Sequence, residues 1–433
     1  MVQLLLIAIR NLVSHKRRTL MLGGAIAGVT MLLVVLLGLL NGIRSTILES
    51  ATTLMTGHVN VGGFFKVTAG QSAPVVTHYR KVVDLVRANV PELDYLTERG
   101  RGWAKVVSET GSMQAGVSGI DIRNEPGFRR VVQVKEGSLD ALAEPGTFLI
   151  FEDQAQRLGV RVGDVVTLSS YTLRGMANTV DVRVVAVAKN VGLLSIFNTY
   201  VPAVTLKALY SLNEDSTGAL LLYLKDIRDV PRVEGRLRQV LGAAGYQLLD
   251  KDPRAFFQKF EVVNREGWTG QRLDVTTWED EIAFVQWTLT AVTWLSYVLI
   301  GILLIIIAVG IMNTLWIAIR ERTREIGTLR AIGMQRTRVL AMFLVEALTL
   351  SLAAALFGAV LGLLACAAVN ALHLHAPLEV QLFLMREELH LAVRPSVLLG
   401  SILLITGCTT LISLIPSFLA ARLQPVTAMH RVG

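Results

Sequence analysis

Cysteine is nearly absent from this chain: Cys366 and Cys408 are the only two, and both lie in long apolar runs. The polar segment between residues 44 and 281 therefore contains no cysteine and can form no disulfide. His373 and His375 lack the cysteines or clustered carboxylates that would complete a metal site with them. We expect no bound metal, and cysteine usage does not indicate a redox compartment.

Sequence motifs for catalysis are missing as well. No glycine is followed by lysine anywhere, so the phosphate-binding loop of nucleotide hydrolases does not occur. Gly116-Val-Ser118-Gly-Ile lacks the spacing of a nucleophile elbow. We expect this chain to have no catalytic residue and to bind no cofactor itself.

Charge is missing from four long stretches, although the chain as a whole has 42 basic and 34 acidic residues. The uncharged stretches lie between Arg18 and Arg44, Glu281 and Arg320, Glu346 and Glu379, and Arg394 and Arg422. Each is longer than the roughly 20 residues that a membrane-spanning helix needs. Together with a mean hydropathy of +0.52, they predict a membrane protein with four transmembrane α-helices and a large α+β extracytoplasmic domain between the first two.

Basic residues gather before the first span, between the second and third, and after the fourth, which places these segments in the cytoplasm by the positive-inside rule. The high pI of 9.6 therefore reflects topology, and we expect no nucleic-acid partner. The expected segments are a cytoplasmic amphipathic helix at 1–18, spans at 19–43, 282–319, 339–371 and 395–421, an outer domain at 44–281, a coupling-helix loop at 320–338, a short outer loop at 372–394 and a cytoplasmic end at 422–433.

The segment 44–281 alternates polar and apolar residues as a water-exposed domain does. Strands are expected at 57–61, 103–107, 113–120, 147–151, 164–168, 180–187 and 219–224, and helices at 79–88, 153–158, 204–210 and 233–243. This mixture predicts an α+β domain of two lobes. We expect a membrane-proximal lobe at about 44–121 and 217–281, with a second lobe inserted at about 122–216.

The second uncharged stretch is unusually long. Its 38 residues, 282–319, would form a helix of about 57 Å, whereas a bilayer core is about 30 Å thick. The excess predicts a stalk between the membrane and the outer domain.

A short charged segment follows this stretch directly: Ile319-Arg-Glu-Arg-Thr-Arg-Glu-Ile-Gly-Thr-Leu-Arg-Ala-Ile-Gly333. On a helix from Arg320 to Ala331, Ile326 and Leu329 form an apolar edge that continues to Ile332, and charged side chains surround it. Such an edge can dock in a groove of a partner. From the residues alone, a solvated loop whose arginines only set topology is an equal alternative.

This segment closely resembles the coupling segment of the FtsX-like ABC permeases, the family of macrolide exporters, lipoprotein-releasing complexes and a cell-division regulator of wall hydrolases. The resemblance extends to Gly57-His-Val-Asn-Val61, Leu158-Gly-x-x-x-Gly163-Asp-x-Val, Trp278-Glu-Asp and Arg422-Leu-Gln-Pro-Val-Thr-Ala428. It implies that an ATPase contacts Glu321, Arg322, Glu325, Ile326, Gly327, Leu329, Arg330 and Gly333. It also implies a mechanotransmission permease in the bacterial inner membrane, working with a cytoplasmic ABC ATPase dimer that binds ATP and Mg²⁺ and with a second permease copy or a paralogue.

Two departures from the family pattern bear on the cargo. The segment Ser170–Thr179 is short where lipoprotein-releasing permeases carry a projecting hairpin for a periplasmic carrier, and Lys251–Leu273 suggests an added helix. Tyr171, Leu173 and Met176 are the bulky apolar residues of the short segment and the candidates for contact with a carrier or adaptor. An ordinary hairpin turn around Arg174-Gly175 is the alternative.

Two kinds of residue inside the spans have more than one interpretation. Gly24 with Gly28 and Gly358 with Gly362 allow close helix packing, either within one subunit or between two. Glu346 is an intramembrane carboxylate, although it lies near the inner interface, where water or an arginine can pair with it.

The favoured function is movement of lipoprotein or lipid-like cargo from the inner membrane. Adaptor-dependent efflux of drugs or peptides is the alternative, and non-transporting activation of a cell-wall hydrolase is a third.

Overall fold

The computed structural model describes Arg10, Ser14 and residues 16–68, 70–321, 323–374 and 389–422. The expected amphipathic helix at 1–18 lies mostly outside the described residues, as do most of the outer loop and the C-terminal segment. The chain divides into two compact units. The helical unit comprises described residues of Met1–Ser45, Leu289–His375 and Glu388–Gly433, and the inserted domain comprises those of Thr46–Thr288.

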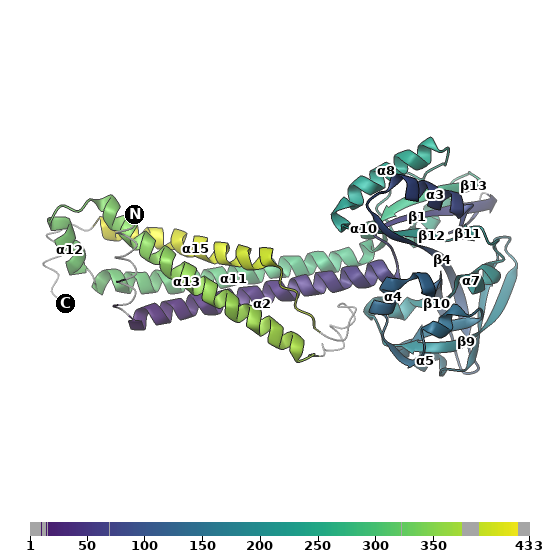
Figure 1. Cartoon of the computed structure of the whole chain (residues 1–433), viewed down its shortest axis with the longest axis horizontal. Helices are drawn as coiled ribbons and strands as arrows, with labels where there is room; N and C mark the ends of the chain where they lie inside the picture. The colour runs from purple at the N-terminus through teal and green to yellow at the C-terminus, as the bar shows by residue number, and fades with distance from the viewer. Residues whose placement is uncertain are drawn as a thin grey trace. The chain divides into compact units, whose positions relative to one another are not determined.

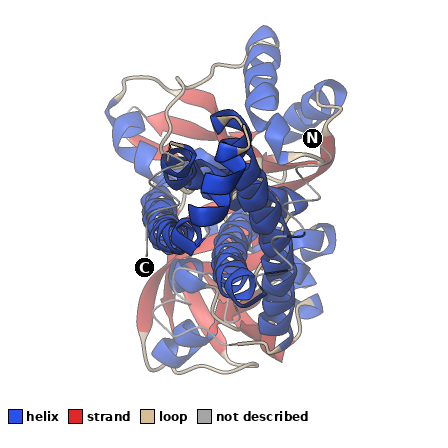
Figure 2. Cartoon of the chain, turned by 90° about the vertical axis from the view of Figure 1, so that its left-hand side faces the viewer, coloured by secondary structure: helices blue, strands red, loops and turns tan. Residues whose placement is uncertain are grey.

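In the part of the chain that the structure describes, four helices are long and apolar enough to cross a membrane. They belong to α2 (Lys16–Leu54), α11 (Ala283–Glu321), α13 (Arg336–Ala371) and α15 (Pro395–Ala421), and the shorter α12 (Thr323–Ala331) lies between α11 and α13. The described part of the helical unit contains no strand, whereas the inserted domain is rich in strands, which are red in Figure 2. The four expected spans are therefore present as helices.

All four of these helices exceed the roughly 20 residues that a membrane requires, and two of them are the longest. The helices α2 and α11 have 39 residues each, which corresponds to about 58 Å. The length of α11 agrees with the expected long second helix. The first helix was expected to end near residue 43, but α2 continues to Leu54 because residues 44–54 contain no glycine or proline to end it.

The helical unit has an apolar core formed by α2, α11, α13 and α15. Its buried members include Ile26, Leu33, Ile311, Ala355 and Ile405. The helix α13 packs along α15 and crosses α2 (Figure 1). The short helix α12 contacts α15 of this bundle.

The inserted domain alternates strands and helices. Its strands are β1 (Val59–Thr68), β2 (Gln71–Ala73), β3 (Val76–Thr77), β4 (Leu93–Val107), β5 (Ser112–Ile120), β6 (Val134–Gly137), β7 (Thr147–Phe151), β8 (Val165–Tyr171), β9 (Ala177–Ala188), β10 (Asn198–Pro202), β11 (Ser216–Thr217), β12 (Ala219–Leu224) and β13 (Gly270–Thr277). Its α-helices are α3 (Tyr79–Asn89), α4 (Pro126–Val131), α5 (Glu152–Leu158), α6 (Gly192–Phe197), α7 (Ala203–Tyr210), α8 (Val230–Ala243), α9 (Phe256–Arg265) and α10 (Trp278–Glu281), with short 3-10 turns at Ile122–Asn124, Asp140–Ala143 and Ile227–Asp229. This confirms the α+β class, and α9 shows a helix within the stretch Lys251–Leu273.

One long strand, β4, joins the two halves of the main sheet. The strand order is β13-β1-β12-β4-β5-β10-β7-β9-β6, with β2 on β1 and β8 on both β4 and β9. The first half of β4, up to Arg99, pairs with β12, and the second half, from Gly100, pairs with β5 and β8. The direction of β4 therefore fixes how the two halves of the sheet meet.

A separate hydrophobic core covers each half of the sheet. The first core packs α3 and α8 against β1, β12 and β13, and the two helices lie side by side in Figure 1. The second core packs α5 and α7 against the second half of β4, β5, β7, β8 and β9. The second core already includes residues between Ala104 and Val117. It therefore begins earlier in the sequence than residue 122, where we expected the inserted lobe to start.

Candidate functional site

The candidate coupling residues lie at the end of α11 and in α12. Of the expected helix from Arg320 to Ala331, Arg320 and Glu321 are helical at the end of α11 and Thr323–Ala331 form α12, while Arg322 lies outside the described residues. Glu321 is exposed and Gly327 is buried, whereas the side chains of Glu325, Ile326 and Leu329 are not among those described. Ile332 is 80% exposed just beyond the end of the helix.

Two local features fix where α12 ends. The Nη1 group of Arg330 donates a hydrogen bond of 2.6 Å to the carbonyl oxygen of Ala421, at the end of α15. Gly333 has a φ of +101°, a left-handed conformation that a side chain would disfavour. The connection from α12 to α13 therefore has a defined geometry. A small buried cluster that includes Ile319, Val339 and Phe343 lies at this end of the helices.

The two glycine pairs of the spans differ in their surroundings. A Cβ atom added at Gly358 would lie 2.3 Å from the carbonyl oxygen of Ala27, and one at Gly362 would lie 2.8 Å from Cβ of Val34. The α13 pair therefore permits close packing against α2 within this chain. Gly24 and Gly28 have no described atom within 4 Å of an added Cβ.

Glu346 is buried between helices, with 7% of its surface exposed. It lines a small cavity of about 30 Å³ together with Thr19, Thr314 and Thr409, and apolar residues of α2, α11 and α13 complete the wall. The cavity is too small to hold cargo.

The segment Ser170–Thr179 forms the tight hairpin between β8 and β9. The N–H of Thr172 donates to the carbonyl oxygen of Met176 at 2.8 Å, and Gly175 takes a φ of +79° in the turn. Tyr171 is 68% exposed and Met176 is 66% exposed, whereas Leu173 is half-buried. Trp103 of β4, which the sequence analysis did not assign to this surface, is also exposed, and its carbonyl oxygen accepts a hydrogen bond from Ser170.

The sequence Gly57-His-Val-Asn-Val61 carries α2 into the sheet. A Cβ atom at Gly57 would lie 2.8 Å from the backbone nitrogen of Leu222, so only glycine lets β12 approach this closely. Nδ1 of His58 accepts a hydrogen bond of 3.0 Å from the N–H of Leu224. Burial lowers the pKa of His58, despite the opposing effect of Asp94.

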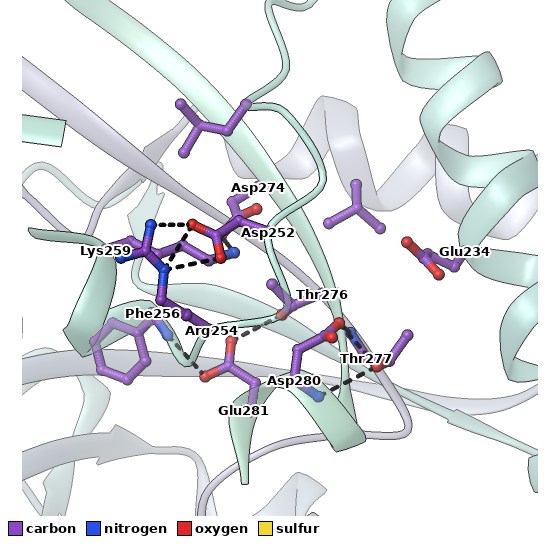
Figure 3. Close-up of polar contacts among 12 residues, drawn as sticks. Glu234, Asp252, Arg254, Phe256, Lys259, Asp274, Thr276, Thr277, Asp280 and Glu281 are labelled. Atoms are coloured by element: carbon purple, nitrogen blue, oxygen red, sulfur yellow. Dashed lines mark hydrogen bonds and ion pairs between the residues drawn. The ribbon is translucent and has the colours of Figure 1, made fainter. Parts of the chain in front are cut away.

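The sequence Thr277-Trp-Glu-Asp-Glu281 prepares the entry into α11. Thr277 and Asp280 form a capping box at the start of α10, and the N–H of Trp278 donates to the carbonyl oxygen of His58. Figure 3 shows the buried carboxylate of Glu281 between the hydroxyl of Thr276, at 2.7 Å, and the backbone N–H of Phe256, at 3.2 Å. Glu281, which lies two positions before the start of α11, thereby binds the start of α9.

Buried charges also hold the rest of α9. Lys259 forms an ion pair of 2.7 Å with Asp274 of β13 (Figure 3), and Nζ of Lys66 donates to the carbonyl oxygens of Val263 and Glu266 at the helix end. Burial raises the pKa of Asp274 even though Lys259 opposes it. The carboxylate of Glu281 thus faces the N-terminus of α9, and the ammonium group of Lys66 faces its C-terminus. This is the arrangement that the helix dipole favours.

Family models match most of the chain. Residues 19–240 match the MacB-like periplasmic core domain, and residues 297–425 match the C-terminal domain of FtsX-like permeases. The first match covers the inserted domain up to α8, and the second covers most of the helical unit with α12.

Curated relatives match smaller parts. A macrolide export ATP-binding/permease protein, MacB, of Aeromonas hydrophila is 34% identical over 154 residues, which are 35% of this chain and 21% of the relative. The MacB of Agrobacterium fabrum is 33% identical over 30% of this chain and 18% of its own length. An uncharacterized ABC transporter permease of Methanocaldococcus jannaschii is 25% identical over 49% of this chain and 45% of its own length. The matches thus span less than half of each of these relatives.

Among solved structures, the periplasmic region of MacB from Actinobacillus actinomycetemcomitans aligns with 56% of this chain and 97% of its own length, at 11% identity and a TM-score of 0.31.

Proposed function

Because this chain belongs to the FtsX-like permeases that carry a MacB-like periplasmic core domain, we propose that it couples ATP hydrolysis by a partner to movement of that domain. It is an ABC transporter permease of the MacB and FtsX type. In this proposal, a cytoplasmic ATPase dimer binds ATP and Mg²⁺ and contacts α12 of two permease copies in the inner membrane. The position of α12, between two spanning helices and anchored to a third through Arg330, is the observation that supports this assignment.

The cargo in this proposal is lipid-like or lipid-anchored. The spanning segments 290–319, 347–371 and 395–421 contain no Asp, Glu, Lys or Arg, and the cavity at Glu346 is small. A hydrophilic path through the membrane would need polar or charged lining. An amphiphile that enters from the bilayer, or one already outside the cytoplasm, does not need such a path.

Efflux of a macrolide-like drug through an adaptor is the second candidate. The names of the relatives from Aeromonas hydrophila and Agrobacterium fabrum state macrolide export. The short hairpin Ser170–Thr179 also favours this candidate over carrier-dependent lipoprotein release, since it presents few side chains to a carrier.

The experiment that tests these proposals starts with proteins that copurify with the permease in mild detergent. The complex is then reconstituted in nanodiscs, and its ATP hydrolysis is measured with a triacylated lipopeptide or with erythromycin. Stimulation by the lipopeptide alone supports lipid-anchored cargo, and stimulation by erythromycin alone supports efflux. If no ATPase copurifies, or if Glu325→Lys leaves stimulated hydrolysis unchanged, the coupling proposal is wrong.

A further inference from the structure

The strand β4 contains an alternating sequence, Arg99-Gly-Arg-Gly102. Side chains alternate between the two faces of a strand, so both arginines point to one face and both glycines to the other. On the glycine face, α7 packs closely: added Cβ atoms at Gly100 and Gly102 would lie 2.4 Å and 2.5 Å from Leu206 and Tyr210. The glycines therefore let a helix cover one face while the other face is free to bind something else.

Arg99 binds the outer end of α2. Its Nη1 donates to the carbonyl oxygen of Leu54 at 3.0 Å, and its Nη2 donates to that of Thr53 at 3.3 Å and to Oε1 of Glu125 at 2.7 Å. The carbonyl groups at a helix C-terminus lack partners within the helix and carry partial negative charge, which a guanidinium satisfies.

Two tyrosine hydroxyls complete this attachment of α2. Tyr200 donates to the carbonyl oxygen of Leu54 and Tyr223 to that of Thr52, each at 2.9 Å. Burial lowers the pKa of Arg99, but the opposite charge of Glu125 raises it, and the net effect is a rise. This guanidinium therefore stays charged under all ordinary conditions.

Arg101 faces the segment that leads into α11. Its Nη1 lies 3.6 Å from Oε1 of Glu281, and its guanidinium lies 4.2 Å from the centre of the Phe256 ring. Its Nε and Nη2 have no hydrogen-bond partner among the described residues, although the side chain is only 6% exposed. The ion pair with Glu281 is therefore longer than a hydrogen bond, and a small shift of α10 would bring the two groups into direct contact.

We propose that β4 is the joint that couples the end of α2 to the start of α11, with Arg99 holding the first and Arg101 holding the second. Two residues on one strand face contact segments that lie more than 220 positions apart in the sequence. A displacement of α10 changes the Arg101–Glu281 distance, and β4 carries the change to Arg99 and the last turn of α2. Its consequence for transport rests on the proposed function, but the coupling itself is a property of this chain alone.

The coupling is measured by hydrogen exchange on the full chain in nanodiscs, without any ATPase. One reporter consists of the amides of Met55 and Thr56, which both donate hydrogen bonds to the carbonyl oxygen of Ala51 at the end of α2. The other consists of the amides of Phe256 and Ile282. The first donates to the carboxylate of Glu281 at the start of α9, and the second, at the end of α10, donates to the carbonyl oxygen of Trp278. Strand β7, buried in the second core, serves as the bystander segment.

Glu281→Gln perturbs the Arg101 side and Glu125→Gln perturbs the Arg99 side. Each variant is expected to speed exchange at its own reporter by about tenfold and at the distant reporter by at least about threefold, because coupling between two sites is reciprocal. Exchange in β7 should stay as in the unsubstituted chain. Arg228→Gln, which removes an exposed ion pair with Asp226 in the same domain, is the matched control and should change neither reporter.

Faster exchange at the local reporter only, in both variants, would overturn the proposal. If either variant speeds exchange throughout the domain, Arg101→Lys is measured to distinguish coupling from a general loss of stability. This variant keeps the positive charge but lacks the planar guanidinium group. Equal acceleration of the reporters and β7 in Arg101→Lys would show a loss of domain stability and would likewise overturn the joint. A failed ATPase assay would leave this measurement unaffected, so the two proposals can fail separately.

Discussion

The guanidinium of Arg330 in α12 donates a hydrogen bond of 2.6 Å to the carbonyl oxygen of Ala421 in α15. A cation at a helix C-terminus interacts favourably with the helix dipole, and the bond also joins two helices through residues that are 91 positions apart in the sequence. The candidate coupling helix is thus held from within the subunit at Arg330.

Replacing Arg330 with Gln should loosen α12 without unfolding the bundle. We expect a loss of about 1–2 kcal/mol in stability, as for a hydrogen bond to a charged group, and a reduction of cargo-stimulated ATP hydrolysis. Thermal unfolding in detergent and ATPase assays with the copurified partner provide the two measurements. Arg336→Gln, which removes an exposed arginine at the start of α13, is the control, and equal behaviour of the two variants would contradict a specific role for Arg330.

Charge reversal within α12 tests docking directly. Glu325→Lys and Leu329→Asp should leave the permease inserted but stop productive work of its ATPase, because a reversed charge in a desolvated groove costs a few kcal/mol. Membrane insertion is checked by carbonate extraction and coupling by stimulated ATP hydrolysis. Normal copurification together with unchanged stimulation in both variants would rule docking out.

Topology follows from the distribution of arginines. Ser138 in the inserted domain and Thr337 at the start of α13 are both exposed, so single cysteines at these positions are accessible from whichever side they face. In a background lacking Cys366 and Cys408, a membrane-impermeant thiol reagent added to spheroplasts should label position 138 and not position 337. Labelling of position 337 from outside would reverse the assigned orientation.

The glycine pairs give opposite expectations for the same substitution. Gly358→Ala should destabilise the helical unit by about 1–3 kcal/mol, since its Cβ would meet the backbone of α2. Gly24→Ala and Gly28→Ala should leave the stability of the single chain nearly unchanged, because no described atom lies nearby. Detergent unfolding and cross-linking of permease pairs separate the cases, and a loss of pairing in Gly24→Ala would assign that pair to an interface between copies.

Burial of His58 predicts a stability that depends on pH. Burial holds the folded pKa of His58 below its ordinary value of 6.5, so the unfolded chain binds a proton more readily. Stability is fully present above pH 6.5 and decreases as the pH falls toward the folded pKa, by at most about 1.4 kcal/mol per pH unit. His58→Asn, which keeps an acceptor for the N–H of Leu224, should flatten the unfolding profile between pH 7 and pH 5. An unchanged slope in His58→Asn, or the same flattening in the exposed control His78→Asn, would contradict this assignment.

Sequence reasoning succeeded where residues are buried on both sides. The expected strands at 147–151 and 219–224 coincide with β7 and β12, whose side chains are all buried and apolar or nearly so. It missed the part of β4 before Trp103, because Arg99 and Arg101 suggest a solvent-exposed segment, and it missed β13, which contains the charged residues Arg272 and Asp274. The period-two alternation of arginine and glycine was the available signal, but its buried partners, Glu125 and Glu281, come from distant parts of the sequence.

The coupling segment illustrates a different limit. Its helical pattern was evident from the spacing of Ile326 and Leu329, and α12 confirms a helix there. The contact of Arg330 with α15 could not be predicted, because periodicity describes a helix face and not the element that covers it.

The hairpin Ser170–Thr179 distinguishes the two cargo proposals. Its turn closes through Thr172 and Met176 and presents two largely exposed apolar side chains, Tyr171 and Met176, with Leu173 half-buried. An interface usually depends on a few large side chains seated in pockets, and this tip is too short to present many. We therefore expect that replacing Tyr171, Leu173 and Met176 by serine leaves cargo movement within about twofold of the unsubstituted permease.

The matched control for this hairpin is Val165→Ser, since Val165 is 55% exposed on the same strand and lies away from the turn. Assembly and ATPase stimulation are measured in parallel for both variants, so that misfolding is recognised separately from loss of a partner. Because the hairpin's backbone bonds do not involve the three replaced side chains, the fold should persist in the triple variant. A complete loss of transport in the triple variant, with normal assembly and normal behaviour of the control, would identify the hairpin as the binding site of a carrier or adaptor and restore the carrier-dependent form of the lipoprotein proposal.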